Sequence, residues 1–267
     1  MYDKKILAHY ANVANLEGNL KSCTMADEYI RKIETEFILI EIKKVVEELK
    51  NKSKKKLKLC DVGCGNGYTL KKISESFLDI EISGIEFTPE LRKIANQKNL
   101  SCEVEFGDIR KIETIPKNQN LIVSQRVLIN LLSIKDQEKA ILNLIASIQE
   151  GGYIIFIEAF NSGLKNLNDC RKELGMIEIP PANHNLYLDD DFFDQFKEIE
   201  KVETELKENA LSTHYFISRV LHDLALTANN ANFTRNSMFV NFFDTALPAG
   251  IGNFSPLKCL VFQKKFI

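Results

Sequence analysis

A glycine-rich turn follows a predicted buried strand at residues 57–67, which read Leu-Lys-Leu-Cys-Asp-Val-Gly-Cys-Gly-Asn-Gly. Glycine has no Cβ, so the backbone at Gly63 and Gly65 can adopt a positive φ and approach a ligand closely. The helix predicted after the turn begins with unpaired N–H groups, which can face the same ligand. The pattern therefore predicts a binding loop for a nucleotide-like molecule.

The spacing of the glycines does not fit a dinucleotide site. The dinucleotide fingerprint has a small residue three positions after its second glycine, where helix and strand pack closely. That position is occupied by Tyr68, and Gly67 comes one residue too early. NAD is therefore disfavoured as the ligand.

The order Asp-x-Gly-x-Gly-x-Gly that begins at Asp61 resembles motif I of class I S-adenosylmethionine (SAM) methyltransferases. A second predicted strand, at 81–86, ends in Glu86, about where a doubly wound fold places a carboxylate for a ribose hydroxyl pair. A third strand, at 102–106, leads into residues 107–109 (Gly-Asp-Ile), which look like the family's adenine site. These features follow one another in the order of the family and strengthen the resemblance.

The resemblance implies a SAM site built from ten residues. The turn would lie against the methionine and ribose, Glu86 would accept the ribose hydroxyls, and Asp108 would hold the adenine edge. Arg31 lies in a segment before the sheet that similar enzymes fold over the cofactor as a lid, where it would pair with the SAM carboxylate. For Arg31 and Gln125 a purely structural role is an equally good alternative. The predicted cofactor-binding residues are Arg31, Asp61, Gly63, Cys64, Gly65, Glu86, Phe87, Asp108, Ile109 and Gln125.

The cadence of strand, loop and helix places this site on an α/β fold. Apolar spacing and turn residues predict further helices at 27–49, 133–149, 166–175 and 211–226, and further strands at 120–123, 153–157, 200–207 and 257–262. As in class I methyltransferases, we expect a doubly wound, mostly parallel seven-stranded sheet, with a helical lid before it and an insertion after the fifth strand. We expect one compact domain, divided into an N-terminal helical lid at 1–50, a SAM-binding Rossmann-like core at 51–159, and an acceptor-binding insertion with the final strands at 160–267.

Composition limits the class of partner. The chain has 267 residues, of which 45% are hydrophobic and 27% charged, and its net charge of −2 gives it no global attraction to nucleic acid. No apolar run approaches the ~20 residues that span a bilayer, and the N-terminus lacks the apolar core of a signal peptide. The six cysteines show no C-x-x-C spacing, and the basic run at 50–58 is more simply a solvated linker than an RNA-binding patch. We expect a cytoplasmic protein with no membrane insertion and no metal.

The segment after the fourth strand argues against a nucleic-acid acceptor. Amino-methyltransferases of DNA and RNA with this fold commonly carry Asn/Asp-Pro-Pro-Tyr/Phe there to grip a flipped base, whereas residues 124–127 read Ser-Gln-Arg-Val. Small molecules, sugars and proteins remain as acceptors.

Residues that bind the acceptor are expected in the second half of the chain. If the acceptor is a hydroxyl, histidine is the usual base near neutral pH, and His184 and His214 are the best-placed candidates. A lone histidine is more often structural than catalytic, and this alternative stays open for both. Arg171 and Arg219 could bind an acidic acceptor, although charges on a helix surface explain them as well. The predicted substrate-binding residues are Arg171, Asn185, Tyr187, Tyr215 and Arg219.

Four short segments, at 24–31, 168–171, 184–187 and 218–220, together resemble more loosely bacterial methyltransferases encoded with surface-polysaccharide genes. This resemblance implies O-methylation of a small, sugar-linked, phosphorylated or nucleotide-activated acceptor in capsule or lipopolysaccharide assembly. N-methylation of a small amine or a protein side chain stays open, as does a SAM-binding module without catalysis. The Asn- and Phe-rich stretch 229–254 is an acceptor wall, a homodimer surface or plain packing.

Overall fold

The computed structural model describes residues 2–18, 20, 23–52, 55–98, 100–229, 231–232 and 236–266. Within these residues, seven strands form one sheet in the order β3-β2-β1-β4-β5-β7-β6. Neighbouring strands from β3 to β5 run parallel, whereas β7 is antiparallel to both β5 and β6. The strands are β1 (Lys58–Val62), β2 (Glu81–Glu86), β3 (Val104–Phe106), β4 (Gln119–Gln125), β5 (Ile148–Ala159), β6 (Ile199–Val202) and β7 (Leu257–Lys264). The predicted mostly parallel seven-stranded sheet is confirmed.

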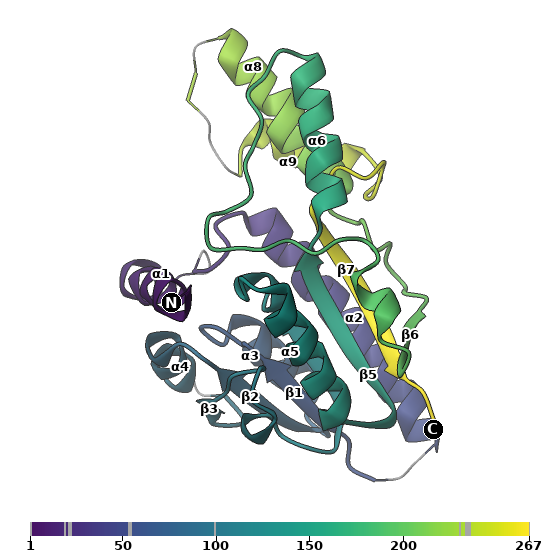
Figure 1. Cartoon of the computed structure of the whole chain (residues 1–267). Helices are drawn as coiled ribbons and strands as arrows, with labels where there is room; N and C mark the ends of the chain where they lie inside the picture. Colours follow the sequence, from purple (N-terminus) through teal and green to yellow (C-terminus); the bar gives the residue numbers. More distant parts are fainter. Residues whose placement is uncertain are drawn as a thin grey trace.

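Helices flank the sheet and extend beyond its carboxyl edge (Figure 1). The α-helices are α1 (Tyr2–Glu17), α2 (Glu28–Lys52), α3 (Tyr68–Ser76), α4 (Pro89–Asn96), α5 (Ile134–Ser147), α6 (Asn161–Glu173), α7 (Ser212–Phe216), α8 (His222–Ala228) and α9 (Met238–Ala246). A π-helical turn, Ile217–Leu221, joins α7 to α8, and short 3₁₀ helices lie at Ile112–Thr114, Leu128–Asn130 and Phe192–Gln195. None of the helices in the described part of the chain is both long and apolar enough to cross a membrane.

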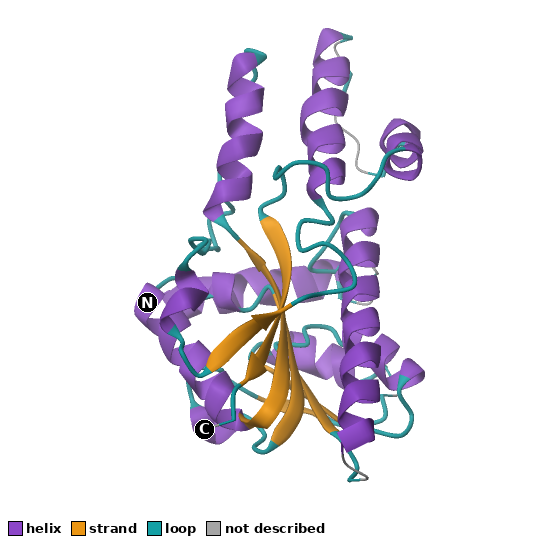
Figure 2. Ribbon diagram, turned by 90° about the vertical axis from the view of Figure 1, so that its right-hand side faces the viewer, coloured by secondary structure: helices purple, strands orange, loops and turns teal. Residues whose placement is uncertain are grey.

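Strand β5 shows why the central strands read as continuous apolar runs. Ile154 and Phe156 belong to the apolar cluster under α5 on one face, whereas Ile155 and Ile157 belong to the cluster under α2 on the other. Side chains alternate along a strand, so both sets are fully buried only because helices cover both faces, as Figure 2 shows. Each of these side chains contributes roughly 1.5–3 kcal/mol of hydrophobic stabilisation.

A helical cap, which we define as α6, α7, the π-helical turn, α8 and α9, lies beyond the carboxyl end of β5 (Figure 1). Helix α6 leaves the sheet directly after β5, and its Gly163 lies against the backbone at residues 255–256. A Cβ at Gly163 would sit 1.9 Å from the carbonyl oxygen of Ser255. Only glycine therefore allows α6 to approach the segment that leads into β7.

Several predicted elements need correction. The helix expected at 211–226 is interrupted by the π-helical turn, and the strand expected at 200–207 ends at Val202. Helix α9 has no counterpart among the predictions, and α1 was expected only as part of the helical lid at 1–50. The polar residues Asn241, Asp244 and Thr245 fall on one side of α9 and its apolar residues on the other, a helical pattern that the sequence analysis missed.

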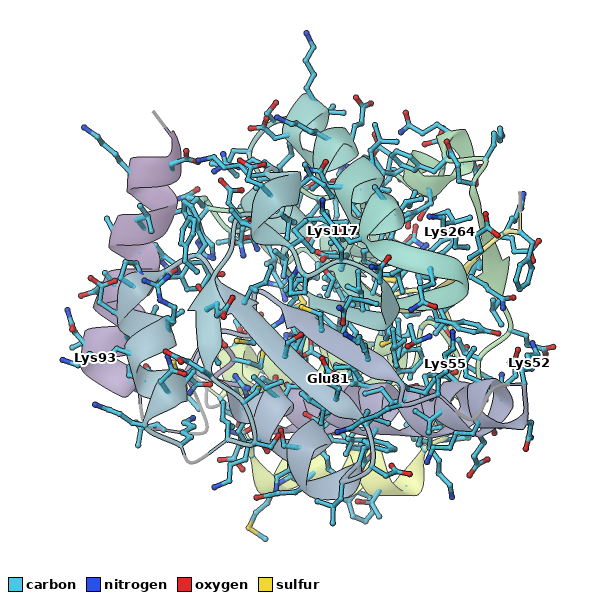
Figure 3. The ribbon with its side chains drawn as sticks, turned by 90° about the horizontal axis from the view of Figure 1, so that it is seen from below. Lys52, Lys55, Glu81, Lys93, Lys117 and Lys264 are labelled. Carbon is cyan, nitrogen blue, oxygen red and sulfur yellow. The ribbon has the colours of Figure 1, made fainter. Side chains whose placement is uncertain are left out.

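The amino-terminal edge of the sheet, seen from below in Figure 3, is surrounded by charged side chains. The labelled ones are Lys52, Lys55, Glu81, Lys93, Lys117 and Lys264. In the basic run before β1, Lys50 pairs with Asp79, and Lys58 lies 3.4 Å from Glu81. Residues 53 and 54 of that run lie outside the described residues. Lys50, Lys52 and Lys58 thus meet surface carboxylates, in keeping with the interpretation as a solvated linker.

Replacing Gly163 by alanine is expected to destabilise the protein, because the added Cβ overlaps the backbone at Ser255. We expect a loss of about 1–3 kcal/mol in the free energy of unfolding, measured by urea denaturation of the full chain. Lys165→Ala, on the same helix but exposed, is the matched control and should change stability by less than about 0.5 kcal/mol. Equal effects of the two changes would contradict this packing of α6.

Candidate functional site

A cavity opens at the carboxyl ends of β1 to β4, beneath α1. Its empty space, which includes solvent at the open side, amounts to about 1030 Å³. All ten residues predicted to bind the cofactor line this cavity. They are Arg31, Asp61, Gly63, Cys64, Gly65, Glu86, Phe87, Asp108, Ile109 and Gln125.

The glycine turn after β1 forms the floor of the cavity. Gly63 and Gly65 have φ of 66° and 57°, in the left-handed region that glycine adopts without a steric penalty. The N–H groups of Gly63 and Cys64 donate to the carbonyl of Ile85 at 2.8 and 3.1 Å, which ties the turn to β2. A Cβ at Gly65 would meet nothing within 4 Å, whereas one at Gly63 would strike Val127 at 2.6 Å. The turn is therefore packed against protein at Gly63 and open to a ligand at Gly65.

Glu86 joins the turns that follow β1 and β2. Its Oε2 accepts the N–H of Gly65 at 2.8 Å, and its Oε1 accepts the N–H of Thr88 at 2.7 Å. Burial raises the pKa of the Glu86 carboxyl, although both backbone hydrogen bonds favour its ionised form. An ionised carboxylate has about four acceptor positions, so Glu86 keeps capacity for a ribose hydroxyl pair.

Asp61, near the end of β1, is a buried carboxyl group for which the protein supplies no cation. It is 2% exposed, and its Oδ2 has no hydrogen-bond partner. Burial, and then the nearby charge of Glu86, raise the pKa of Asp61 to about 8. A buried carboxylate without a partner is costly, and it fits a cationic ligand group beside it. The ammonium or sulfonium of SAM would supply that charge.

The expected adenine end of the cavity contains an ion pair that the sequence analysis missed. Asp108 accepts from Nε and Nη2 of Arg110, both at 2.8 Å, and Arg110 also donates to Asp3 of α1 at 2.8 Å. The Arg110 guanidinium lies 5.7 Å from the ring centre of Phe87. Asp108 thus lines the cavity as expected, but an adenine amine would have to share its oxygens with Arg110.

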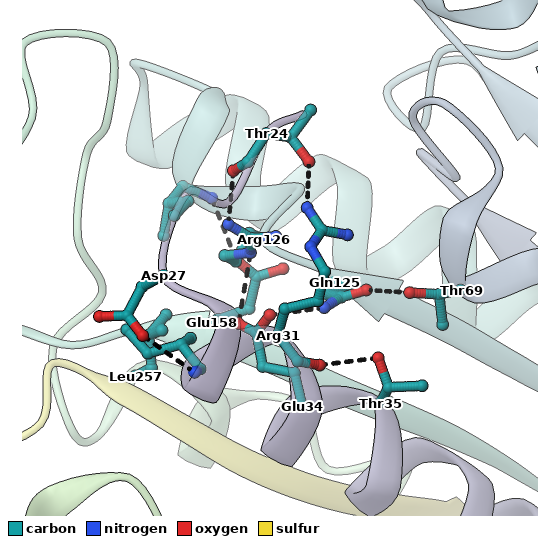
Figure 4. A network of polar contacts seen from close by, with 12 residues as sticks. Thr24, Asp27, Arg31, Glu34, Thr35, Thr69, Gln125, Arg126, Glu158 and Leu257 are labelled. Carbon is teal, nitrogen blue, oxygen red and sulfur yellow. Dashed lines mark hydrogen bonds and ion pairs between the residues drawn. The ribbon is translucent and has the colours of Figure 1, made fainter. Parts of the chain in front are cut away.

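Arg31 and Gln125 meet at the other end of the cavity (Figure 4). Gln125 accepts from the Thr69 hydroxyl at 2.9 Å and donates to Glu34 at 2.7 Å. Arg31 is 5% exposed, donates to Thr24 Oγ1 at 3.2 Å, and has a buried Nε without a partner. Arg31 is therefore not a solvated helix residue; it presents a buried cation to the cavity, as a site for the SAM carboxylate requires.

Glu158, at the carboxyl end of β5, positions the loop after β4. Its carboxylate accepts the N–H groups of Val127, Leu128 and Ile129 at 3.0 to 3.3 Å. Burial raises the pKa of Glu158 to about 7, against the effect of these hydrogen bonds. Glu158 does not line the cavity itself, but it holds Val127 and its neighbours in the wall.

Sequence reasoning missed a second set of lining residues. Some of them, such as Tyr68 and Arg126, could have been inferred because they lie close in sequence to predicted site residues. A lid was expected at 1–50, but nothing in the sequence showed which residues of α1 line the cavity, because their contacts are long-range. The missed residues are Asp3, Ile6, Tyr10, Thr24, Asn66, Tyr68, Thr69, Thr88, Leu91, Arg110, Arg126, Val127, Asn130 and Leu131.

The two histidines predicted as general bases do not line the cavity. His214 is buried between Asp244, 2.8 Å from Nδ1, and Asp27, 3.0 Å from Nε2. Burial opposes its charged form, but the two carboxylates outweigh this and raise the pKa of His214. His184 stacks on His9 of α1 at 3.8 Å, and burial lowers its pKa to about 4. Both histidines are engaged by other parts of the protein, so the structure gives no support to a base role, which stays a prediction.

The residues predicted to bind the acceptor also lie outside the cavity lining. Arg171 donates to Asp223 at 2.7 Å and to the carbonyl of Ile177 at 2.8 Å, and Arg219 donates to Asp27 at 2.9 Å. Both guanidinium groups are engaged by partners within the protein, and their expected role in binding an acidic acceptor stays a prediction.

The three other predicted acceptor residues are part of the packing around the end of β5. Tyr187 and Tyr215 pack against an apolar cluster that contains Ile129 and Ala159. Asn185 has a buried Oδ1 without a partner. None of the three contributes to the cavity wall.

Comparison with known proteins agrees with the fold and with a SAM site at this edge of the sheet. Residues 53–237 match the family described as "Methyltransferase domain". A search of curated proteins gave no match. Several solved structures match the fold, and three of them are described next.

The plantazolicin methyltransferase BpumL in complex with S-adenosylhomocysteine (SAH) matches over 100% of both chains, with a TM-score of 0.53 and 14% identity. A proposed sarcosine dimethylglycine methyltransferase from Galdieria sulphuraria matches over 84% of each chain, with a TM-score of 0.50 and 13% identity. SAM-bound CalS10, an amino pentose methyltransferase from Micromonospora echinaspora, matches over 43% of this chain and 48% of its own, with a TM-score of 0.36 and 20% identity. The chain thus spans about half the length of CalS10. At these identities the likeness shows the fold.

We expect SAM binding to release a proton from Asp61 near pH 7. Since burial holds the pKa of Asp61 at about 8, a cationic group beside it must favour the ionised form, and affinity should rise with pH up to about 8. The change is up to roughly tenfold per pH unit below that value. Calorimetry in two buffers of different ionisation enthalpy measures the proton.

Asp61→Asn should bind SAM more weakly and lose the proton release. The exposed carboxyl of Asp79 offers the matched control, Asp79→Asn, which should leave both unchanged. The same pH dependence in wild type and Asp61→Asn would show that Asp61 is not the titrating group.

We expect His214→Gln to destabilise the protein by about 3 kcal/mol at pH 6, because it breaks a buried ion pair. The raised pKa of His214 means that its stabilisation is complete below its ordinary pKa of 6.5 and is lost as pH rises through the raised value. The lowered pKa of Asp27 keeps that partner ionised at both pH 6 and pH 9. Urea denaturation at pH 6 and pH 9 should therefore show a smaller loss at pH 9.

His184→Gln is the control for this pH dependence. With its pKa lowered to about 4, folded His184 is neutral at both pH values, whereas the unfolded chain, with the ordinary pKa of 6.5, binds a proton at pH 6. The loss of stability in His184→Gln should therefore be smaller at pH 6 than at pH 9, the opposite of His214→Gln. A loss of stability in His214→Gln that does not change between pH 6 and pH 9 would rule out a charged His214.

Proposed function

The chain belongs to the family of methyltransferase domains and uses SAM as its methyl donor, and we propose that it methylates a small-molecule acceptor held beneath α1. The observation that carries the proposal is the cover of the cavity. Asp3 of α1 pairs with Arg110 at 2.8 Å, and Tyr10 of α1 donates to Asn130 at 3.1 Å. All four of these residues line the cavity. Such a cover leaves room for a small molecule rather than for a polymer strand.

The protein contributes alignment and exclusion of water to the reaction. Bound SAM supplies a methyl carbon made electrophilic by its positively charged sulfur. The acceptor atom donates a lone pair to that carbon while the carbon–sulfur bond breaks, sulfur keeps the bonding electrons, and the acceptor releases a proton. Asp61 would hold the cationic end of the donor, and α1 would keep water from the sulfur.

O-methylation of a sugar-linked, phosphorylated or nucleotide-activated acceptor in capsule or lipopolysaccharide assembly is our first candidate reaction. It is supported by the loose resemblance to methyltransferases encoded with surface-polysaccharide genes. The net charge of −2 and the absence of a base-gripping sequence at 124–127 support an acceptor other than nucleic acid. Capsule precursors are assembled in the cytoplasm, and we propose that location for the enzyme.

N-methylation of a small amine is the second candidate. All four histidines lie in the described part of the chain, and none lines the cavity. A neutral amine carries its own lone pair and needs no base before it attacks, whereas a hydroxyl benefits from one. A structure of the same fold is that of a proposed sarcosine dimethylglycine methyltransferase, whose name implies an amine acceptor.

The stretch 229–254 does not support the acceptor-wall interpretation, because none of its described residues lines the cavity. Met238 and Phe242 of α9 are 89% and 66% exposed. A homodimer that covers them stays a prediction. Residues 230 and 233–235 of this stretch lie outside the described residues.

The function is tested by combining cofactor binding with an acceptor screen. We expect SAM and SAH to bind below roughly millimolar, and Glu86→Ala to weaken both at least about tenfold, because Glu86 anchors the turns after β1 and β2. Glu90→Ala, an exposed acid in the first turn of α4, is the matched control and should bind normally. Calorimetry measures the affinity of the wild type and of the two variants for SAM and for SAH.

The screen measures SAH release with hydroxyl acceptors (methyl glucoside, glucose 1-phosphate, UDP-glucose) and amine acceptors (glycine, ethanolamine). Turnover that Glu86→Ala abolishes and Glu90→Ala retains supports an enzyme, and the acceptor identifies O- or N-methylation. Tight SAM binding with no turnover above background on any acceptor would instead favour a SAM-binding module.

A further inference from the structure

Arg126 has a backbone conformation that is unusual for its side chain. It follows β4 directly and has a φ of 58°, in the left-handed region. Its Nη1 donates to the carbonyl of Thr24 at 2.9 Å, and Thr24 also has a positive φ, of 68°. Thr24 is β-branched, so this conformation is rarer still. Two strained residues in contact beside a cavity are typical of a ligand clamp.

The guanidinium of Arg126 is only loosely engaged by the protein. Its Nε lies 3.3 Å from Oε1 of Glu34, yet neither atom makes a hydrogen bond. The side chain is 16% exposed and lines the cavity, whereas Glu34 is fully buried behind it. Arg126 therefore has donor capacity left for a ligand.

Glu34 is shared by two arginines. This single carboxylate interacts with both Arg31 and Arg126, and burial raises its pKa, which weakens its negative charge. An anionic ligand beside Arg126 would therefore meet a guanidinium that has only part of one carboxylate as its partner.

Arg31 and Arg126 both donate to Thr24, but each has a further neighbour of its own. The Arg31 guanidinium lies 4.8 Å from the ring centre of Tyr68, at the start of α3 and beside the glycine turn. Burial raises the pKa of Tyr10 on α1 and the nearby charge of Arg126 opposes this, while the backbone carbonyl of Arg126 accepts from Asn130 at 2.8 Å. Arg31 is thus placed for the donor carboxylate, and Arg126 for a molecule between the donor and α1.

We propose that Arg126 anchors an anionic group, a carboxylate or a phosphate, of the methyl acceptor. The inference rests on the proposed function, because it assumes that the acceptor lies beside bound SAM under α1. Tyr10 and Asn130 would complete the polar wall around that acceptor. This role is an alternative to the one expected for Arg171 and Arg219, whose guanidinium groups have partners within the protein.

The first experiment needs no turnover, so its failure is distinct from a failure of the proposed function. With the full chain saturated with SAH, calorimetry measures the binding of sodium phosphate and sodium acetate against a sodium chloride background. We expect at least one of the two anions to bind the wild-type complex in the millimolar range. Arg126→Asn should weaken that anion at least tenfold while SAH affinity changes less than threefold.

The variants are chosen to keep the backbone intact. Asparagine tolerates a positive φ better than most residues, so Arg126→Asn removes the charge without adding strain. If the loss of positive charge beside the buried Glu34 unfolds this variant, Arg126→Asn combined with Glu34→Gln removes both charges. Arg126→Lys should retain part of the anion affinity, because a point charge still attracts the anion but lacks the planar fork.

Arg31→Lys is the matched control on the neighbouring arginine. It should weaken SAH at least tenfold and leave anion affinity within threefold once the complex is saturated. The reverse pattern, in which Arg126→Asn loses SAH affinity and keeps anion affinity, would overturn the proposal. It is equally overturned if neither anion binds the wild-type complex.

A second experiment identifies the source of the anion, using acceptor pairs that differ in one charge. Glycine against ethanolamine tests a carboxylate, and glucose 1-phosphate against methyl glucoside tests a phosphate. For the pair on which the enzyme acts, Arg126→Asn should raise KM for the charged member at least tenfold and leave the neutral member within threefold. Equal losses on both members would contradict an anion anchor.

Discussion

Burial of both faces of the parallel sheet is the constraint on which the rest of this structure depends. Ile154 and Ile155, neighbours in β5, face opposite layers and are both completely buried. Polar groups can then occur only where strands end, and the parallel strands β1 to β4 end at the same edge. The acids and the amide at those ends, Asp61, Glu86 and Gln125, are brought together as a consequence.

The buried carboxylates at this edge differ in whether the protein supplies their hydrogen-bond donors. Glu86 and Glu158 accept hydrogen bonds from backbone N–H groups. These bonds offset the cost of burying the two carboxylates and hold the neighbouring loops in position. Asp61 has no such partner at its Oδ2, and its pKa is raised to about 8. The protein therefore stabilises two acids itself and leaves the third for a cationic ligand.

Segments distant in sequence are joined by a few polar contacts rather than by one continuous core. Asp27 caps α2 through the N–H of Ile30 at 3.3 Å and also binds His214 and Arg219 of the helical cap. Asp3 on α1 reaches Arg110 on the far side of the cavity. These contacts hold α1 and the helical cap beside the carboxyl edge of the sheet, which the strands alone would leave exposed to solvent.

The sequence by itself determined the cofactor half of this protein, and the tertiary structure decided the acceptor half. Asp61, Glu86 and Asp108 could be recognised because each follows a buried strand, and a parallel sheet brings strand ends together whatever the loops do. His184, His214, Arg171 and Arg219 lie in helices and loops, where spacing along the chain does not say which side chains meet. Only the packing showed that His184 stacks on His9 and that carboxylates and carbonyls engage the other three. It also showed that Arg126, next to the predicted residue Gln125, lines the cavity. The physical reason is that strand ends are placed by local hydrogen-bonding geometry, whereas side-chain partners 30 to 200 residues apart are selected by the fold as a whole.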